Sequence, residues 1–340
     1  MLYEKLKMLP KTELHLHLGG SVNAKTFIEL ANKHGLHIPV EYEEPDDLYD
    51  YDNLADFLKV YSLISQACID KDDFHRITYE CLSRCAEHGA RYVELFFSPE
   101  EHLKYGVSYQ TILDGIIAGA DDAEKDRGVT YQLIPAINRE LGPERAIQFV
   151  DMVCAYKRDD IIGIGLDFDE TANPPQVFEA AFNLATKNGL HKTSHEGEVG
   201  PASNVVNSID VLGCERVDHG YHIVDDVQQM NRFAQEQILF TVCPVTTTVT
   251  TKWRDLDAED HAIRVMADAG LKIMINSDDP PMLHTDLTNE YILMVDKLKF
   301  GIEDIKTFIL NGIDGAWLDE STKRQWRSEW SAEIDRIILE

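Results

Sequence analysis

Two histidines, His15 and His17, stand one residue apart in the alternating run KTELHLHLGGS, residues 11 to 21. Side chains i and i+2 of a β-strand point to the same side, about 6.6 Å apart, so both imidazoles can converge on one small object. Imidazole nitrogen is a ligand that Zn²⁺ accepts readily. The pair alone is equally compatible with a half-exposed strand whose histidines face water, so the rest of the chain must decide between these interpretations.

Three more groups of polar residues lie at the ends of β-prone runs further along the chain. They are SHEGE with His195 and Glu198, DHGYH with Asp218 and His219, and NSDDP with Asp278 and Asp279. A single histidine at a strand end is more often structural or solvated. Four strand ends that each carry His or Asp are difficult to explain in that way, so the sequence predicts one site at which these ends meet.

Eight short β-prone runs alternate with segments of helical periodicity. The runs are ELHLHL (13–18), RYVELFF (91–97), YQLIPAI (131–137), IIGIGLDF (161–168), HKTSHE (191–196), RVDHG (216–220), ILFTVCP (238–244) and LKIMINS (271–277). Several intervening helices are expected to end at a glycine just before the next strand, at Gly89, Gly189 and Gly270. This alternation is typical of a parallel α/β sheet, and eight units can close into a barrel.

We therefore expect the whole chain, residues 1–340, to form a single (β/α)₈ TIM barrel domain. An open doubly wound sheet is the alternative, but no G-x-G-x-x-G motif follows the first run. Two insertions, around residues 40–88 and after residue 286, fall outside the eightfold pattern and predict extra helices after strand 1 and at the C-terminus. The four polar groups would then share the catalytic face of the barrel.

The composition limits the partners that the chain can have. Its 340 residues carry 60 acidic and 32 basic side chains, a formal charge of −28, which argues against nucleic acid or an anionic membrane. The six cysteines form no C-x-x-C pair and are expected to be reduced. No signal peptide or run of 18 apolar residues is present, so we expect a cytoplasmic protein. Nothing in the sequence indicates an oligomeric state.

His15, His17, His195 and Asp278 form a donor set suited to one catalytic zinc ion, which keeps one position for water and lowers the pKa of that water. Fe²⁺ or Co²⁺ would also suit these ligands. The fourth run, IIGIGLDF, offers no lysine for a second metal, so one ion per chain is expected.

The remaining polar residues are assigned roles around this metal. Glu198 can donate a proton to a ring nitrogen, and His219 can orient or deprotonate the attacking water. Asp279 should point into the substrate pocket, although a strand-end cap is an alternative role for it.

The motifs ELHLHLGGS, SHEGEVGP, ERVDHGYH and INSDDPPM, in this order and spacing, resemble the adenosine/adenine deaminase family of the amidohydrolase superfamily. The resemblance extends from LPKTELHLHL to NGIDGAWL, and it implies a zinc-dependent barrel that converts a 6-aminopurine to the 6-oxopurine with release of ammonia. It implies that Glu198 protonates purine N1, that His219 lies beside the attacking water, and that Asp279 binds near N7.

The resemblance also implies an apolar lid from NLADFLKVY, through Leu54, Phe57 and Tyr61, although an ordinary amphipathic helix would show the same periodicity. Two positions depart from the nucleoside-specific members. Gly19 replaces an acid that reaches towards the ribose, and Phe168 replaces a small residue near purine N3. We therefore favour a free adenine-type base, possibly N6-substituted, as the substrate.

Other functions stay open at this point. Adenosine, 2′-deoxyadenosine or a modified nucleoside is the alternative substrate, because HGYH and HTDLTNEY are similar to the nucleoside enzymes. Another amidohydrolase reaction would share the barrel and the metal, but it would not need Glu198 as a ring-nitrogen acid. A catalytically silent purine-binding homologue is disfavoured, because every ligand and both proton-transfer groups are present.

Overall fold

The computed structural model describes residues 2–51 and 54–339, apart from the side chains of residues 54, 55 and 339. Within these residues the strands are short and pair only in parallel. They are β1 (Lys11–His17), β2 (Ala90–Phe97), β3 (Thr130–Asn138), β4 (Gly163–Asp167), β5 (His191–Lys192), β6 (His195–Glu196), β7 (Arg216–His219), β8 (Leu239–Val242) and β9 (Lys272–Ile275).

Hydrogen bonds join the two runs of paired strands, β1 to β5 and β6 to β9, into a closed barrel. At one seam the amide of Thr193 donates to Ile164 and the carbonyl of Ser194 accepts from Asp218, so β5 and β6 are two halves of one strand. At the other seam, the amide of His17 donates to the carbonyl of Asp278, 2.9 Å away. The predicted (β/α)₈ barrel is confirmed, but the predicted fifth strand, 191–196, is interrupted where its pairing passes from β4 to β7.

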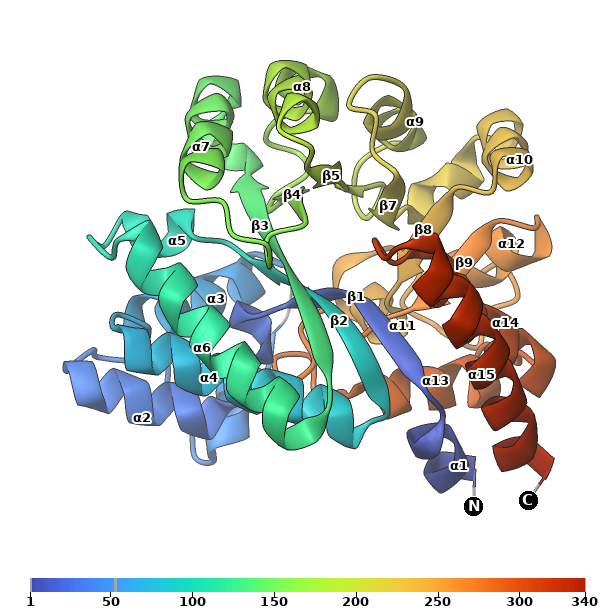
Figure 1. Ribbon diagram of the computed structural model, residues 1–340, viewed down its shortest axis with the longest axis horizontal. Coiled ribbons are helices and arrows are strands. Elements are labelled where there is room, and N and C mark those ends of the chain that lie inside the picture. Colours follow the sequence, from blue (N-terminus) through green and yellow to red (C-terminus); the bar gives the residue numbers. More distant parts are fainter. Residues whose placement is uncertain (1, 52–53, 340) are drawn as a thin grey trace.

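Helices surround the barrel, and Figure 1 shows α7, α8, α9 and α10 following one another around its outside. The helices are α1 (Leu2–Met8), α2 (Ala24–His34), α3 (Leu54–Ala67), α4 (Lys71–Glu87), α5 (Glu100–Leu103), α6 (Tyr109–Arg127), α7 (Pro143–Ala155), α8 (Glu179–Lys187), α9 (Ala202–Asp210), α10 (Val227–Glu236), α11 (Pro244–Thr250), α12 (Ala262–Asp268), α13 (Leu287–Asp296), α14 (Ile302–Gly315) and α15 (Glu320–Leu339). The predicted insertion around residues 40–88 corresponds to α3 and α4, and the one after residue 286 corresponds to α13, α14 and α15. The preceding helix α2 lies outside the predicted bounds. Among the described helices, none is both long enough and apolar enough to cross a bilayer.

A buried ion pair fills the barrel interior away from the strand C-termini. The guanidinium of Arg216, at the start of β7, lies 2.5 Å from the carboxylate of Glu94 on β2, and both side chains are almost completely buried. Arg216 also donates to the carbonyl of Leu14 at 3.1 Å and stacks on the ring of Trp317, with 4.0 Å to its centroid. The Trp317 amide donates to Glu94, so the segment after α14 is tied into the barrel interior. The guanidinium of Arg216 on β7 thus contacts β1 through Leu14 and β2 through Glu94, and it links these three strands.

Replacing Arg216 by Met should destabilise the barrel strongly, because the Glu94 carboxylate would remain buried without its counter-charge. Removal of one partner of a buried pair costs about 3–5 kcal/mol of unfolding free energy, measurable by chemical denaturation. The matched control is Arg232→Met, whose guanidinium pairs with Asp210 at the surface and whose loss should cost about 1 kcal/mol or less. Equal losses in the two variants would contradict this prediction.

Candidate active site

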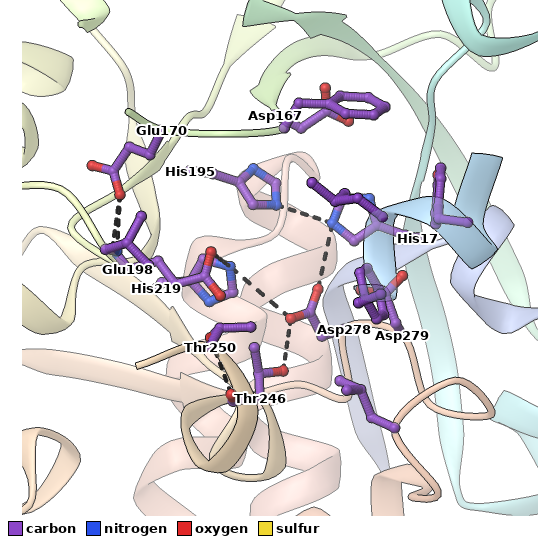
Figure 2. Close-up of a pocket in the computed structure, with 16 residues that line it drawn as sticks. His17, Asp167, Glu170, His195, Glu198, His219, Thr246, Thr250, Asp278 and Asp279 are labelled. Carbon is purple, nitrogen blue, oxygen red and sulfur yellow. Dashed lines mark hydrogen bonds and ion pairs between the residues drawn. The ribbon is translucent and has the colours of Figure 1, made fainter. Parts of the chain in front are cut away.

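A pocket opens where the barrel strands end, with α3 on one side and α11 on another (Figure 2). Closing parallel strands into a barrel brings all their C-terminal ends to one face. Its polar lining from the strand ends consists of His17 at the end of β1, Asp167 at the end of β4, His195 at the start of β6, His219 at the end of β7, and Asp278 after β9. The structure therefore brings together the four polar groups that the sequence singled out.

Three imidazoles and one carboxylate converge at the floor of this pocket. The Nε2 atoms of His17 and His195 lie 2.9 Å apart. The Oδ1 atom of Asp278 lies 3.1 Å from Nε2 of His15 and 3.4 Å from Nε2 of His17. One donor atom from each of the four residues lies within 4.8 Å of the other three, and all four residues are buried. The four predicted ligands thus form one compact cluster.

His15, His195 and Asp278 are each oriented by a second partner behind them. Nδ1 of His15 lies 2.8 Å from the hydroxyl of Thr241, and Nδ1 of His195 lies 3.0 Å from the carbonyl of Leu166. The hydroxyl of Thr246 donates to Oδ2 of Asp278 at 2.7 Å. These contacts leave Nε2 of both histidines and Oδ1 of Asp278 directed at the common point, as outer partners of metal ligands do.

Zinc fits this donor set. Nε2 of His15 is buried and makes no hydrogen bond. A buried nitrogen without a partner costs free energy, which coordination to a metal ion would remove. Three imidazole nitrogens and one carboxylate oxygen are also donors that a catalytic zinc accepts. The four residues can therefore hold one zinc ion at the floor of the pocket.

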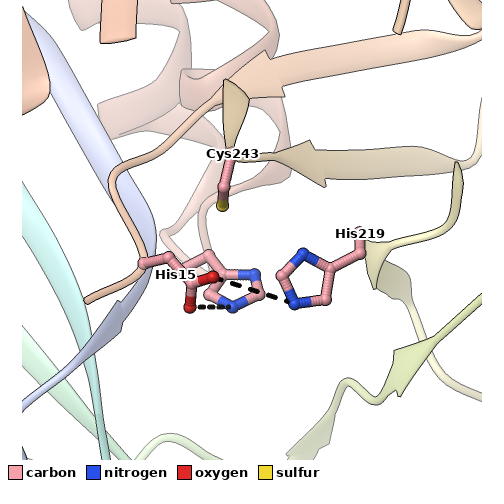
Figure 3. Close-up of side chains that lie close together, drawn as sticks. His15, His219 and Cys243 are labelled. Atoms are coloured by element: carbon pink, nitrogen blue, oxygen red, sulfur yellow. Dashed lines mark ion pairs between the residues drawn. The ribbon is translucent and has the colours of Figure 1, made fainter. Parts of the chain in front are cut away.

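A second set of donors lies within 4.8 Å of one another beside the first (Figure 3). It consists of His15, His219, Cys243 and Asp278. Because it shares His15 and Asp278 with the first set, it is part of the same cluster and not an independent site. Cys243 is completely buried and lies outside the pocket lining, whereas His17 and His195 line the pocket. The first set therefore has three members in the pocket lining (His17, His195 and Asp278), and the second set has two (His219 and Asp278).

Glu198 and His219 stand next to the cluster on the pocket side. Oε2 of Glu198 lies 3.8 Å from Nε2 of His219, and the same nitrogen lies 4.0 Å from Oδ2 of Asp278. Burial raises the pKa of the Glu198 carboxyl above its ordinary value, although the charge of His219 and a hydrogen bond with Thr250 act in the opposite direction. A carboxyl whose pKa is raised towards neutrality can act as a general acid.

Aromatic side chains from two segments line the apolar side of the pocket. Phe57 and Tyr61 come from α3 and Phe168 follows β4; the rings of Tyr61 and Phe168 meet edge to face with centroids 6.1 Å apart. Gly19 lies behind Tyr61, so close that a Cβ atom at Gly19 would be 2.6 Å from the tyrosine ring. The third predicted lid residue, Leu54, has a side chain outside the described residues, and Leu58 lines the pocket from the same helix.

Three non-glycine residues at the pocket have left-handed backbone conformations. The φ angles are 69° at Phe168, 66° at His219 and 64° at Asp278. Such conformations cost about 1–3 kcal/mol each and persist where surrounding contacts enforce them, typically at functional sites. All three residues follow or end a barrel strand, so the backbone turns sharply at the points where these side chains enter the pocket.

Asp279, predicted to face the substrate, lines the pocket as its neighbour Asp278 turns towards the cluster. The pocket also contains four polar residues for which sequence reasoning assigned no role: Asp167, Glu170, Thr246 and Thr250. Burial raises the pKa of Asp167 to about 8, and its Oδ2 atom accepts a hydrogen bond from Ser98. The threonines form part of the run PVTTTVT directly after a β-prone segment, and this position at a strand end was the signal that could have found them.

Comparisons with known proteins agree on one family. The family model for adenosine deaminase matches residues 10–332. The chain is 32% identical to an adenine deaminase of Psychrobacter cryohalolentis, over 94% of this chain and 96% of the other, and 33% identical to one of Vibrio parahaemolyticus, over 94% of each.

Solved structures give the same result. An amidohydrolase from Burkholderia ambifaria, crystallised with bound zinc, superimposes with a TM-score of 0.93 at 38% identity, covering 99% of this chain and 93% of the other. An adenine deaminase from Arthrobacter aurescens gives a TM-score of 0.89 at 31% identity, covering 96% of this chain and 99% of the other.

Replacing Thr246 by Val should weaken zinc binding, because Oδ2 of Asp278 would lose the hydroxyl that fixes its orientation. Loss of such a partner typically lowers metal affinity about 10–100-fold, measurable by competition with a chelating dye. Thr248→Val is the matched control on the same helix, since its hydroxyl donates only to the carbonyl of Val245. Unchanged affinity in Thr246→Val, or an equal loss in the control, would contradict the orienting role of Thr246.

Proposed function

The chain belongs to the adenosine deaminase family, and we propose that it is a zinc-dependent hydrolase that deaminates the free base adenine at C6, yielding hypoxanthine and ammonia. The relatives at 31–33% identity that span nearly the whole chain are adenine deaminases, which supports the base rather than the nucleoside as substrate. The zinc-containing neighbour at 38% identity supports the metal.

The observation that carries this proposal is the shared opening of the metal cluster, Glu198 and His219 onto one small pocket. When bound to His15, His17, His195 and Asp278, zinc would supply the Lewis acidity that makes water a nucleophile near neutral pH. The hydrolysis requires in addition an acid for a ring nitrogen and a group that accepts a proton from water. The two residues beside the cluster provide these two functions.

Glu198 is the proposed acid. Its side chain is largely buried, lines the pocket and has its carboxylate 3.8 Å from His219. A proton delivered from Glu198 to purine N1 makes C6 more electrophilic, and His219 orients the attacking water and accepts its proton. The oxygen of water forms the new C6–O bond, the C6–N6 bond breaks, and the amino group leaves as ammonia with the proton that His219 took from water. N1 keeps the proton from Glu198, and the remaining hydroxyl proton at C6 passes to Glu198 as the 6-oxo group forms.

Asp279 is the proposed partner of the purine near N7. It lines the pocket next to Asp278, so a base held by Asp279 on one edge and Glu198 on the other would present C6 to the cluster. Holding the reacting atoms in one orientation accounts for a large part of the rate of such a reaction.

The contact between Gly19 and Tyr61 favours a base over a nucleoside. With no side chain at Gly19, the Tyr61 ring lies directly against the backbone, in space that an acidic side chain would otherwise occupy. Tyr61 lines the pocket together with Phe57 and Phe168, so an aromatic wall stands beside Gly19, the position at which the family resemblance implies a ribose contact in the nucleoside-specific members. A ribose hydroxyl buried against this wall would lack a partner, which costs binding free energy.

The zinc-loaded protein should release ammonia from adenine and convert it to hypoxanthine, followed by absorbance, with little or no turnover of adenosine or 2′-deoxyadenosine. Glu198→Gln should lower kcat for adenine by about 10²–10⁴-fold, because the acid is lost while zinc content stays the same. Faster turnover of the nucleosides than of adenine would exclude the base preference. No turnover of any compound in the panel, which also includes N6-methyladenine, would remove the proposed function.

Replacing Tyr61 by Ala should open space beside Gly19 and admit a ribose, raising kcat/KM for adenosine by about 10-fold or more while kcat/KM for adenine falls. Tyr61→Phe is the control, since it keeps the ring and should keep the preference for adenine. If Tyr61→Ala leaves the ratio of the two kcat/KM values unchanged, the aromatic wall does not select the substrate.

A further inference from the structure

The carboxylate of Glu170, three residues beyond the end of β4, is almost completely buried and is surrounded by backbone amides. Its Oε1 atom accepts from the amide of Gly197 at 2.6 Å and from Nδ2 of Asn204 at 3.3 Å. Its Oε2 atom accepts from the next three amides, those of Glu198 at 3.1 Å, Val199 at 3.1 Å and Gly200 at 2.8 Å. Four consecutive amides of the loop between β6 and α9 thus point at one carboxylate.

The backbone conformation of this loop and its glycine at position 200 fit the Glu170 carboxylate. Consecutive amides that turn inwards form a concave anion site, and a buried carboxylate is the anion here. A Cβ atom at Gly200 would overlap the Glu170 carboxylate, so the close approach requires glycine. No lysine or arginine of residues 2–51 and 54–339 forms an ion pair with this carboxylate. Its negative charge is therefore stabilised chiefly by the loop.

A second contact fixes the start of the same segment. The backbone carbonyl of Glu170 accepts from Nη1 of Arg139 at 3.5 Å. Nη2 of Arg139 donates to the carbonyl of His195 and to the carboxylate of Glu196, both at 2.7 Å. Glu170 and Arg139 together hold residues 195–200. This segment contains both His195 of the metal cluster and Glu198, the proposed acid.

We propose that Glu170 is a positioning residue for the deamination, which holds the Glu198 carboxyl in the orientation that delivers a proton to the purine. This inference rests on the proposed role of Glu198. Figure 2 shows Glu170 at the edge of the pocket, joined to the backbone at Glu198 and not to the centre of the cluster. Both of its oxygens are occupied by loop amides, so it acts through the loop and not by touching the substrate.

Glu170→Gln tests the proposal. The NH₂ group of the new glutamine would face the backbone N–H groups of the loop, and two donors cannot form a hydrogen bond, so the loop should become looser. We expect kcat for adenine to fall about 10²-fold, as misplacement of a reacting group by about 1 Å does, while KM and zinc content stay unchanged. Glu170→Asp, which keeps the charge, should recover part of kcat. Asp169→Asn is the matched control. The Asp169 carboxylate, next to Glu170 in the sequence, accepts hydrogen bonds from Thr171 and from no loop amide between residues 197 and 200, so full activity is expected.

A double-mutant cycle distinguishes positioning from a general structural role. If Glu170 acts through Glu198, then Glu170→Gln should cost little further activity in a Glu198→Gln background. Independent, multiplicative losses would overturn the proposal. So would full activity of Glu170→Gln, or loss of zinc or of folding in both Glu170 variants.

Amide hydrogen exchange separates failure of this inference from failure of the proposed function. In Glu170→Gln the amides of residues 197–200 should exchange faster than in the unsubstituted protein, whatever the substrate is. Unchanged exchange at these amides would overturn the positioning role. A wild-type protein that shows this protection but does not turn over adenine would instead overturn the proposed function and with it the catalytic purpose assigned to Glu170.

Discussion

The convergence of His15, His17, His195 and Asp278 on one buried point imposes the main constraint on this structure. Polar atoms taken out of water are costly unless each has a partner, and here their inner atoms face one another at 2.9 to 3.4 Å. The outer atoms of His15, His195 and Asp278 are therefore held individually, by Thr241, the carbonyl of Leu166 and Thr246 respectively. Asp218 extends this support because its carboxylate accepts from both Thr241 and Thr193. The cluster thus determines which polar residues the surrounding strands must carry.

The same rule governs two buried ion pairs of the barrel. Glu94 and Arg216 form a pair in the interior, and Glu196 pairs with Arg139 beside the pocket. Burial raises the pKa of Glu196 to about 8, while Arg139 opposes this effect by favouring the ionised form. Neither pair hydrogen-bonds to a side chain of the metal cluster, but Arg139 donates to the backbone carbonyl of His195. The ion pairs therefore connect barrel stability to the geometry of the site.

Local patterns were sufficient to predict the barrel and the members of the cluster, because a strand fixes side-chain direction with a period of two and a parallel barrel places all strand ends on one face. The positive φ angles at Gly89, Gly189 and Gly270 agree with the predicted helix ends. The interruption of the fifth strand was not predictable, since it depends on pairing with β4 and β7 and not on its own residues. Thr246, Thr250 and Glu170 were missed for a related reason. Their roles arise from contacts with residues distant in the sequence. The position of the threonines after a β-prone run marks them as candidates, but neither they nor Glu170 carry a local pattern that shows which residues they contact.

The metal cluster and the proposed acid Glu198 are held in position in two different ways. The metal cluster is built largely on strand ends, whose positions follow from the barrel's hydrogen bonds. Glu198 instead lies in a loop, where no ladder of hydrogen bonds defines the backbone, and loops are the most mobile connections of a fold. A general acid must nevertheless lie within hydrogen-bond reach of the atom that it protonates. The Glu170 carboxylate gives the loop the hydrogen-bond partners that a neighbouring strand would otherwise supply, and this accounts for a buried acid so close to the pocket that pairs with no lysine or arginine among the described residues.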